Sequence, residues 1–195
     1  MTTLYFVRHA QPNYDNHNDL TRELSPKGLN DRRLVCDWLA DVPVNAVLSS
    51  PYKRAVDTVS PLAEGRGLPI RTIDDLRERR IDSCWIEDFN AFCQAQWENF
   101  DYRLSDGESL GQVQRRCVPA VEAILREYAG QTVVIGSHGT ALSCIINHYA
   151  PTFGYKDFQR IRGLMPWLVR FTFEGASCRE IISIDPFTNE KRALL

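Results

Sequence analysis

The segment Leu4-Tyr5-Phe6-Val7-Arg8-His9-Ala10 combines an apolar run with two basic side chains. Its four successive apolar residues predict a buried strand, and an arginine and a histidine follow at the carboxyl end of that strand. Open α/β sheets place their chemistry outside the carboxyl ends of their strands. We therefore expect Arg8 and His9 to lie at a functional site.

Two other segments repeat this arrangement. Thr132–Ile135 predicts a second buried strand, and Gly136-Ser137-His138-Gly139 follows it. Leu48-Ser49-Ser50-Pro51 ends a third strand and leads into a helix whose first turn carries Arg54. Parallel strands of one sheet end at the same edge, so two arginines and two histidines are expected around one site.

Apolar strands alternate with amphipathic helices along the whole chain. This alternation predicts an α/β fold, a three-layer α/β/α sandwich with a mostly parallel sheet and an antiparallel edge. A length of 195 residues fits a single domain over 1–195. The expected strands lie near 3–8, 44–48, 68–70, 132–135, 167–173 and 178–184, and the expected helices begin at Ser25, Pro51 and Ser109 and after His138.

One of these helices and one further segment carry more specific expectations. Ser25 and Pro26 fit the N-cap and first position of a helix, which should turn Leu29, Leu34, Val35 and Trp38 inward. Between Asp82 and Tyr102, aromatic residues recur at spacings of three to four and predict another helix. This second helix either packs on the core or forms a lid over the site, and we describe it as a helical lid insertion at about 82–106.

Composition narrows the function classes. The net charge of −2 is spread over mixed-sign segments, which argues against a nucleic-acid surface, and no apolar run reaches membrane-spanning length. Six cysteines are scattered without a Cys-x-x-Cys pair, as expected of reduced core thiols rather than a metal site or disulfides. We expect a soluble, cytoplasmic protein with no metal and no cofactor.

In the order of its motifs, the chain resembles the histidine phosphatase superfamily, in its phosphoglycerate-mutase-like branch. The resemblance rests on six short segments found in the family's order: Arg8-His9-Ala10, Leu24-Ser25-Pro26-Lys27-Gly28, Ser49-Ser50-Pro51 with Arg54-Ala55, Leu76-Arg77-Glu78, Gly107-Glu108-Ser109 and Ser137-His138-Gly139. The family's usual Arg-His-Gly is Arg-His-Ala here. Gly139-Thr140 after His138 differs from the His-Asp pair of the phytase-like branch.

Phosphoryl transfer needs cationic stabilisation around an in-line nucleophile. Arg8 and Arg54 can hold phosphate oxygens bidentately, and His138 can donate a further hydrogen bond. His9 is the expected nucleophile, because a neutral imidazole can form a phosphohistidine and the family uses its corresponding histidine in this way.

The resemblance implies that Glu78 is the general acid that protonates the leaving oxygen. Asp82 and Glu108 are the alternatives. Where relatives carry an asparagine that contacts phosphate, this chain has Asp15, which would repel it, so Asn13 or Asn16 is expected to take that role. Arg115 and Arg116 either meet a substrate carboxylate or line a solvated helix face.

Three functions fit this pattern. A phosphomonoester hydrolase acting on a small phosphorylated substrate is favoured, because the chain lacks the longer insertions and tail of the phosphoglycerate-type mutases. Such a mutase would use the same residues but protect its phosphohistidine from water. A noncatalytic phosphate-binding module is the third, and the presence of nucleophile, cradle and acid together argues against it. The oligomeric state and the substrate's identity do not follow from the residues.

Overall fold

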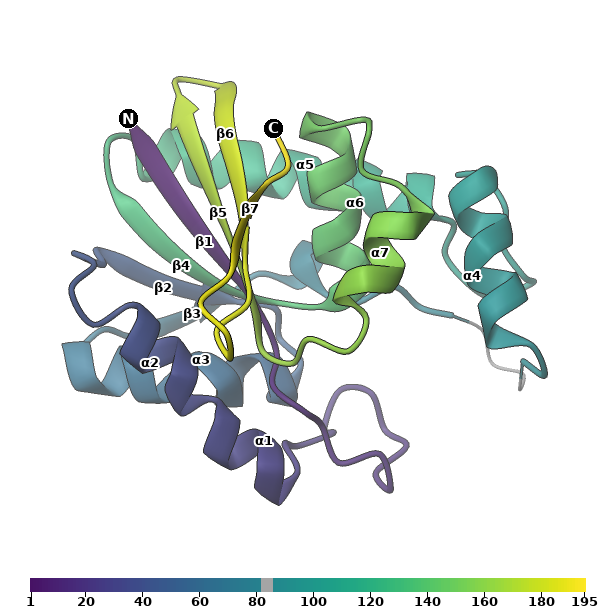
Figure 1. Cartoon of the computed structure of the whole chain (residues 1–195), viewed down its shortest axis with the longest axis horizontal. Coiled ribbons are helices and arrows are strands. Elements are labelled where there is room, and N and C mark those ends of the chain that lie inside the picture. Colours follow the sequence, from purple (N-terminus) through teal and green to yellow (C-terminus); the bar gives the residue numbers. More distant parts are fainter. Residues whose placement is uncertain (82–85) are drawn as a thin grey trace.

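The computed structural model describes residues 1–81 and 86–195, and within them seven strands form one sheet in the order β3-β2-β4-β1-β5-β6-β7 (Figure 1). Strands β1 to β4 pair in parallel, whereas β5, β6 and β7 add antiparallel. Because β6 runs in the same direction as β1, most strands share one direction. The strands are β1 Thr2–Arg8, β2 Ala46–Ser49, β3 Ile70–Thr72, β4 Thr132–Ser137, β5 Trp167–Glu174, β6 Ser177–Ile184 and β7 Lys191–Ala193.

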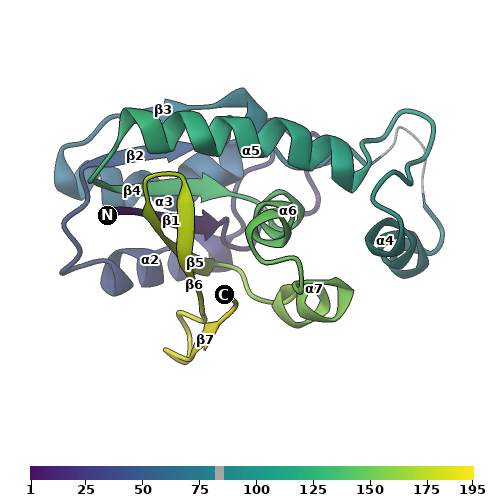
Figure 2. The same cartoon turned by 90° about the horizontal axis from the view of Figure 1, so that it is seen from above.

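Helices cover both faces of this sheet, as Figures 1 and 2 show. Leu4 and Phe6 of β1 belong to the apolar cluster that includes α5 and α6, whereas Tyr5 and Val7 pack with α2 and α3. Successive residues of the strand therefore face opposite layers, which confirms the three-layer sandwich. The helices are α1 Pro26–Asp31, α2 Arg33–Trp38, α3 Lys53–Arg66, α4 Phe89–Glu98, α5 Leu110–Glu127, α6 Gly139–Tyr149 and α7 Tyr155–Ile161, with a 3₁₀ turn η1 at Asp74–Leu76.

The helix expected to begin after Ser25 is two short helices that meet at Arg32. Ser25 does cap α1, since its hydroxyl accepts a hydrogen bond from the backbone N–H of Gly28. Leu29 is 45% exposed, so the expectation that it faces inward is wrong. The reason is the close approach at Gly28, where a Cβ would lie 2.1 Å from the carbonyl oxygen of Gln11. Helix α1 therefore packs on the rest of the protein through the face that carries Gly28, and the adjacent Leu29 points away from it.

The antiparallel half also differs from expectation. The hairpin of β5 and β6 is present, but β7 pairs with β6 and forms the sheet edge beyond it. The third strand, expected at 68–70, begins only at Ile70. Helix α7 and strand β7 were not anticipated from the sequence.

Helix α4 occupies the centre of the segment that we expected to be helical between Asp82 and Tyr102. Its Trp97 lies 5.6 Å, centroid to centroid, from both Phe100 and Phe158, so the aromatic face packs into the core as well as against α7. Asp82 and the other residues of 82–85 lie outside the described residues. No helix within the described part of the chain is both long and apolar enough to span a membrane.

Candidate active site

The carboxyl ends of three adjacent strands, β2, β4 and β1, bring the expected residues together. Arg8 is paired in register with Ser137, and Ser49 with Gly136, so His9 and His138 follow neighbouring strand ends. Their ring centroids lie 5.3 Å apart. Arg54, in the first turn of α3, is close enough to both rings to lower their pKa values. Segments more than 120 residues apart in the sequence thus form one cluster of arginines and histidines.

His9 is held in one tautomer. Its Nδ1 lies 2.8 Å from the carbonyl oxygen of Ala10, which can only accept a hydrogen bond, so Nδ1 carries the proton and Nε2 keeps its lone pair. The side chain is buried, and burial, Arg54 and Arg8, in that order, lower the pKa of His9 well below its ordinary value. His9 is therefore neutral at pH 7, as a nucleophile must be.

Arg8 is fixed from one side and open on the other. Its Nη1 donates to the carbonyl oxygens of Ile161, Arg162 and Leu164, at 2.8, 3.1 and 3.1 Å. Its buried Nε makes no hydrogen bond within the described residues. An unpartnered buried N–H is costly, so this donor suits an anionic ligand.

Arg54 is positioned by the loop that follows β1. Its Nη1 donates to the carbonyl oxygen of Asp19 at 2.7 Å and lies 3.5 Å from that residue's carboxylate. The guanidinium stacks on the Tyr52 ring, 5.0 Å from its centroid. Arg54 is only 3% exposed, and burial lowers its pKa.

His138 is oriented by Ser50. The ring Nε2 lies 2.7 Å from the Ser50 hydroxyl, and that hydroxyl also accepts the backbone N–H of Tyr52. A hydroxyl that donates to Nε2 leaves the proton on Nδ1, and this buried nitrogen has no partner among the described residues. Burial and Arg54 lower the pKa of His138, so the ring is a neutral donor. Ser50 belongs to a motif quoted above, but its contact with His138 was not expected from the sequence.

The carboxyl group of Glu78 lies at the N-terminus of α6, directly after His138. One oxygen accepts the backbone N–H of Thr140 at 3.0 Å, and the other accepts those of Ala141 and Arg79, at 3.0 and 2.7 Å. Glu78 and Arg8 line the same pocket. The structure therefore places the expected acid beside the arginine and histidine cluster.

The two asparagines expected to contact phosphate are engaged elsewhere. The amide groups of Asn13 and Asn16 donate to the two carboxylate oxygens of Glu23, at 2.7 and 2.8 Å. The hydrogen bond from Asn16, which has the larger effect, and that from Asn13 lower the pKa of Glu23 to about 2. Asp15 is exposed. Arg22 from the same loop lowers the pKa of both His9 and Arg54 by its charge, and nothing in its sequence context indicated that role.

The carboxylate of the alternative acid Glu108 pairs with Arg116, with 2.7 Å between oxygen and nitrogen. Burial alone would raise the pKa of Glu108, but the Arg116 guanidinium brings it below its ordinary value. Arg115 is exposed, as are His17 and His148. Asp82, the other alternative, lies outside the described residues.

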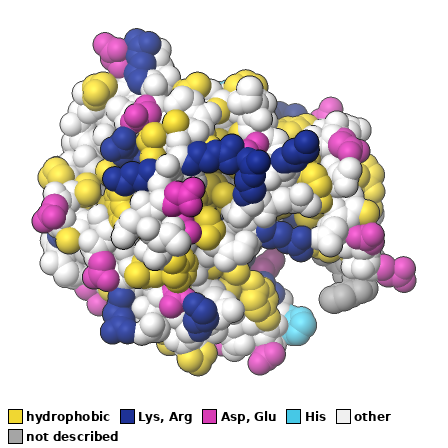
Figure 3. Space-filling model, in the orientation of Figure 1, with side chains coloured by type: hydrophobic (Ala, Val, Ile, Leu, Met, Phe, Trp, Pro, Cys, Tyr) yellow, Lys and Arg dark blue, Asp and Glu magenta, His cyan; other side chains and the backbone are white. Residues whose placement is uncertain are grey.

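A pocket of about 310 Å³ opens beside Arg8 and Glu78, and Arg79, Phe89 and Arg162 also line it. Figure 3 shows a hollow in this part of the surface, between the region of α4 and α7 and the loop after β1, with basic side chains on its wall. Arg79 is 4% exposed, has no hydrogen bond at Nε and makes no ion pair with any described residue. The pocket therefore presents positive charge that the described residues leave unpaired.

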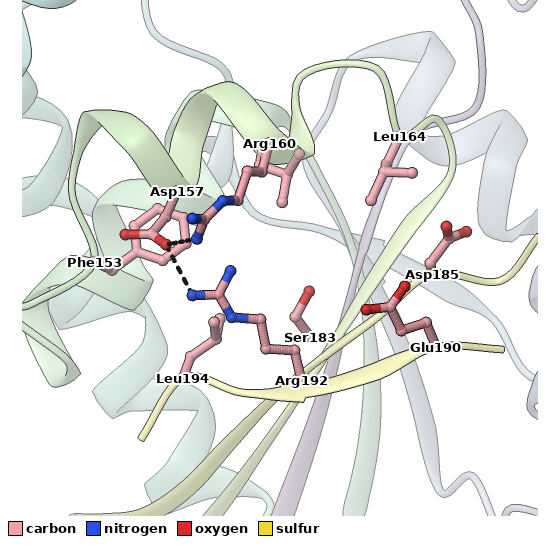
Figure 4. A pocket seen from close by; sticks show the side chains of 10 residues that line it. Phe153, Asp157, Arg160, Leu164, Ser183, Asp185, Glu190, Arg192 and Leu194 are labelled. Carbon is pink, nitrogen blue, oxygen red and sulfur yellow. Dashed lines mark hydrogen bonds and ion pairs between the residues drawn. The ribbon is translucent and has the colours of Figure 1, made fainter. Parts of the chain in front are cut away.

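A second pocket, of about 250 Å³, lies between α7 and the C-terminal strands (Figure 4). Its Arg160 and Arg192 both bind Asp157, at 3.1 and 3.3 Å, so its positive charge is largely neutralised. Two of its lining residues, Ile161 and Leu164, supply carbonyl oxygens that hold Arg8. Nowhere in residues 1–81 and 86–195 do three or more His, Cys, Asp or Glu side chains group as metal ligands would.

Comparisons with known proteins identify the family of the chain. The model of the histidine phosphatase superfamily (branch 1) matches residues 4–180, so the chain belongs to that family. A probable phosphoglycerate mutase GpmB of Yersinia pestis is 26% identical over 159 residues, covering 75% of this chain and 74% of that protein.

Solved structures share the fold at lower identity. Bacillus stearothermophilus YhfR superimposes with a TM-score of 0.74 at 24% identity, covering 92% of this chain and 95% of that one. A mycobacterial glucosyl-3-phosphoglycerate phosphatase gives 0.73 at 20% identity, covering 98% and 96%. Entamoeba histolytica phosphoserine phosphatase in complex with 3-phosphoglyceric acid gives 0.73 at 16% identity, covering 92% and 94%.

Proposed function

We propose that the protein is a metal-independent phosphomonoester hydrolase that works through a phosphohistidine at His9. One observation carries the proposal: the backbone carbonyl of Ala10 holds the proton on Nδ1 of a buried His9, which leaves Nε2 unprotonated between two arginines. A noncatalytic phosphate-binding module would have no need of such a nucleophile, nor of a carboxyl group beside it.

In the first step, the lone pair of Nε2 attacks phosphorus in line, the P–N bond forms and the P–O bond to the leaving group breaks. Glu78 gives its proton to the departing oxygen. The free Nε of Arg8, the guanidinium of Arg54 and the Nδ1–H of His138 stabilise the peripheral phosphoryl oxygens. These cationic groups supply the charge neutralisation that other phosphoryl-transfer enzymes obtain from Mg²⁺.

In the second step, the carboxylate of Glu78 takes a proton from water, and the oxygen of that water attacks the phosphorus. The P–N bond breaks, His9 recovers its lone pair, and inorganic phosphate leaves. Acid and base are thus one residue used in both directions. The neutral resting state of His9 returns without any further proton donor.

The substrate is proposed to be a small phosphate ester with a second anionic group. Arg79 and Arg162 carry positive charge beside the catalytic cluster, and the pocket of about 310 Å³ fits a small metabolite. Among the described residues, the hydrogen-bond partners of the Arg79 side chain are Gln96 and Cys93, and none is acidic, so a ligand carboxylate or phosphate would pair with a buried charge that these residues do not neutralise. Phosphorylated hydroxy acids and amino acids have this combination of charges.

We also propose that the chain is a single domain, 1–195, in which α4, from the insertion at about 82–106, covers this pocket, since Phe89 of α4 lines the pocket together with Arg8. The free thiols of Cys36, Cys93, Cys117, Cys144 and Cys178 favour a reducing, cytoplasmic location. A phosphoglycerate-type mutase is the second candidate function, favoured by the similarity to the probable phosphoglycerate mutase GpmB.

One experiment separates these functions. Purified enzyme is given a panel of phosphorylated metabolites in EDTA, and free phosphate and isomerised product are measured in parallel, with His9→Ala as the control. We expect metal-independent release of phosphate that the variant abolishes. Isomerised product without phosphate release would establish the mutase, and activity that only added metal restores would refute the proposed site.

A further inference from the structure

Arg116 of α5 lies directly beneath the segment that carries Glu78. Its Nη1 donates to the carbonyl oxygens of Asp75 and Arg77, both at 2.8 Å, and its Nη2 donates to that of Glu78 itself at 3.2 Å. Three backbone carbonyls on and just before the proposed acid thus converge on one guanidinium. That guanidinium is largely buried, with 10% of its side chain exposed.

Glu108 completes the arrangement from the other side. Its two carboxylate oxygens accept from Nε and Nη2 of Arg116, at 2.7 and 2.9 Å. The same carboxylate accepts the backbone N–H of Arg80 at 3.0 Å, and the N–H of Glu108 donates to the Arg80 carbonyl at 2.8 Å. The chain is therefore fixed on both sides of Glu78, before it by Arg116 and after it by Glu108.

This use of Arg116 leaves no donor for a ligand. A guanidinium has five N–H groups. Glu108 takes the N–H of Nε, the carbonyl oxygens of Asp75 and Arg77 take those of Nη1, where the Cys117 sulfur also lies 3.4 Å away, and Glu78 and Glu108 take those of Nη2, which excludes Arg116 as the partner of a substrate carboxylate. Glu108 is likewise occupied, so it is not available as the acid.

We propose that Arg116 and Glu108 are positioning residues that set the place and direction of the Glu78 carboxyl group and so govern protonation of the leaving oxygen. This inference rests on the proposed function, in which Glu78 is the general acid. Among the described residues, the carboxyl group of Glu78 is bonded only to backbone N–H groups, two of them in α6, so the position of the Glu78 segment relative to α6 decides where its proton is delivered. A shift of the segment 75–80 would move the acid while leaving the arginines and histidines of the cluster in place.

The test compares substrates that need the acid with one that does not. Turnover of glycerol phosphate requires protonation of an alkoxide, whereas the phenolate of para-nitrophenyl phosphate leaves with little help. Glu78→Gln, Arg116→Met, Arg116→Lys and the double variant Glu78→Gln/Arg116→Met are measured on both substrates. Arg115→Met is the matched control, because Arg115 is the exposed neighbour on the same helix.

We expect Glu78→Gln to slow glycerol phosphate by about 10²- to 10⁴-fold, the usual effect of one acid–base step. Arg116→Met should slow it by about 10- to 100-fold through misplacement of the acid, with less than about 3-fold loss on the nitrophenyl ester. The double variant should be no slower than Glu78→Gln. Affinity for inorganic phosphate and the activity of Arg115→Met should be unchanged.

Equal losses on both substrates in Arg116→Met, with Glu78→Gln selective, would overturn the inference and leave the proposed function standing. Additive losses in the double variant would also overturn it, because Arg116 would then act independently of Glu78. A Glu78→Gln enzyme without selectivity would refute the acid assignment and the inference with it. Should Arg116→Met fail to fold, Arg116→Lys decides, since three ammonium donors cannot replace five guanidinium donors and its selectivity should be intermediate.

Discussion

Gly139→Ala is the substitution that most directly tests how Arg8 is held. A Cβ at position 139 would lie 3.1 Å from both Cζ and Nε of Arg8, and 3.3 Å from Nη2. Ordinary van der Waals contact begins at 3.4 Å, so the guanidinium must move by about 0.3 Å or more. Three carbonyl oxygens hold its Nη1, which leaves movement at Nε as the cheaper response.

The expected loss follows from that displacement. A misplacement of 1 Å can cost about 10²-fold, so a shift of about 0.3 Å corresponds to roughly 4-fold. Complete loss of one charge-assisted hydrogen bond to phosphate, about 1.5 kcal/mol at the low end, would be about 10-fold. We therefore expect the affinity for inorganic phosphate and kcat/KM to fall by about 4- to 10-fold.

The assay is competitive inhibition by inorganic phosphate, together with thermal unfolding. Gly65→Ala in α3 is the control, because a Cβ there meets no atom within 4 Å. That variant should keep full phosphate affinity. A Gly139→Ala enzyme with unchanged affinity would refute the reasoning, because Arg8 would then not contact the phosphate from this position.

Three further predictions concern charge. The acid limb of the pH profile of kcat/KM should lie well below pH 6.5, because burial, Arg54 and Arg8 lower the pKa of His9, and a limb centred at pH 6.5 would contradict this. In the unfolded chain the histidine takes up its proton near pH 6.5, so the stability of the fold should fall as the pH drops below that value. Arg79→Met should weaken the binding of phosphoglycerate by about 10- to 100-fold and leave the binding of para-nitrophenyl phosphate unchanged, with Arg80→Met, at an exposed position, as the control. Equal effects on both substrates would contradict a second anion site at Arg79. Glu23→Gln should lower the melting temperature at pH 6 but not at pH 2, because the pKa of Glu23 is about 2 in the folded protein and about 4.3 in the unfolded chain. A difference in melting temperature between variant and natural protein that stays constant from about pH 2 to pH 6 would contradict the role of Asn13 and Asn16.

The parallel half of the fold and the four central residues of the site could be predicted from the sequence for one physical reason. Strands that are buried on both faces have sequences that are short continuous apolar runs, and in a parallel sheet the residues that follow them lie at one edge of the sheet. Leu4–Val7 and Thr132–Ile135 are such runs. No comparable signal marks α7, which has only seven residues and a glycine, Gly154, at its N-cap, or β7, which has three exposed residues.

The substrate side of the site was harder to predict because burial there is decided by tertiary contacts. Arg77, Arg79 and Arg80 look alike in the sequence, yet only Arg79 is buried, under Phe92 and Phe89 of α4. Arg116 and Glu108 lie eight positions apart, and neither spacing nor composition shows that both support the chain around Glu78. Asn13 and Asn16 were expected to contact phosphate from their place after the Arg-His pair, and the structure shows their amides bound to Glu23.

Rapid quenching of the enzyme during turnover of a radiolabelled phosphate ester tests the phosphohistidine most directly. We expect label on the protein that is lost in acid and retained in alkali, that forms and decays at least as fast as phosphate is released, and that maps to His9. His9→Ala should carry no label and release no phosphate. Turnover by His9→Ala close to that of the natural enzyme, or rapid turnover without any labelled protein, would contradict the mechanism.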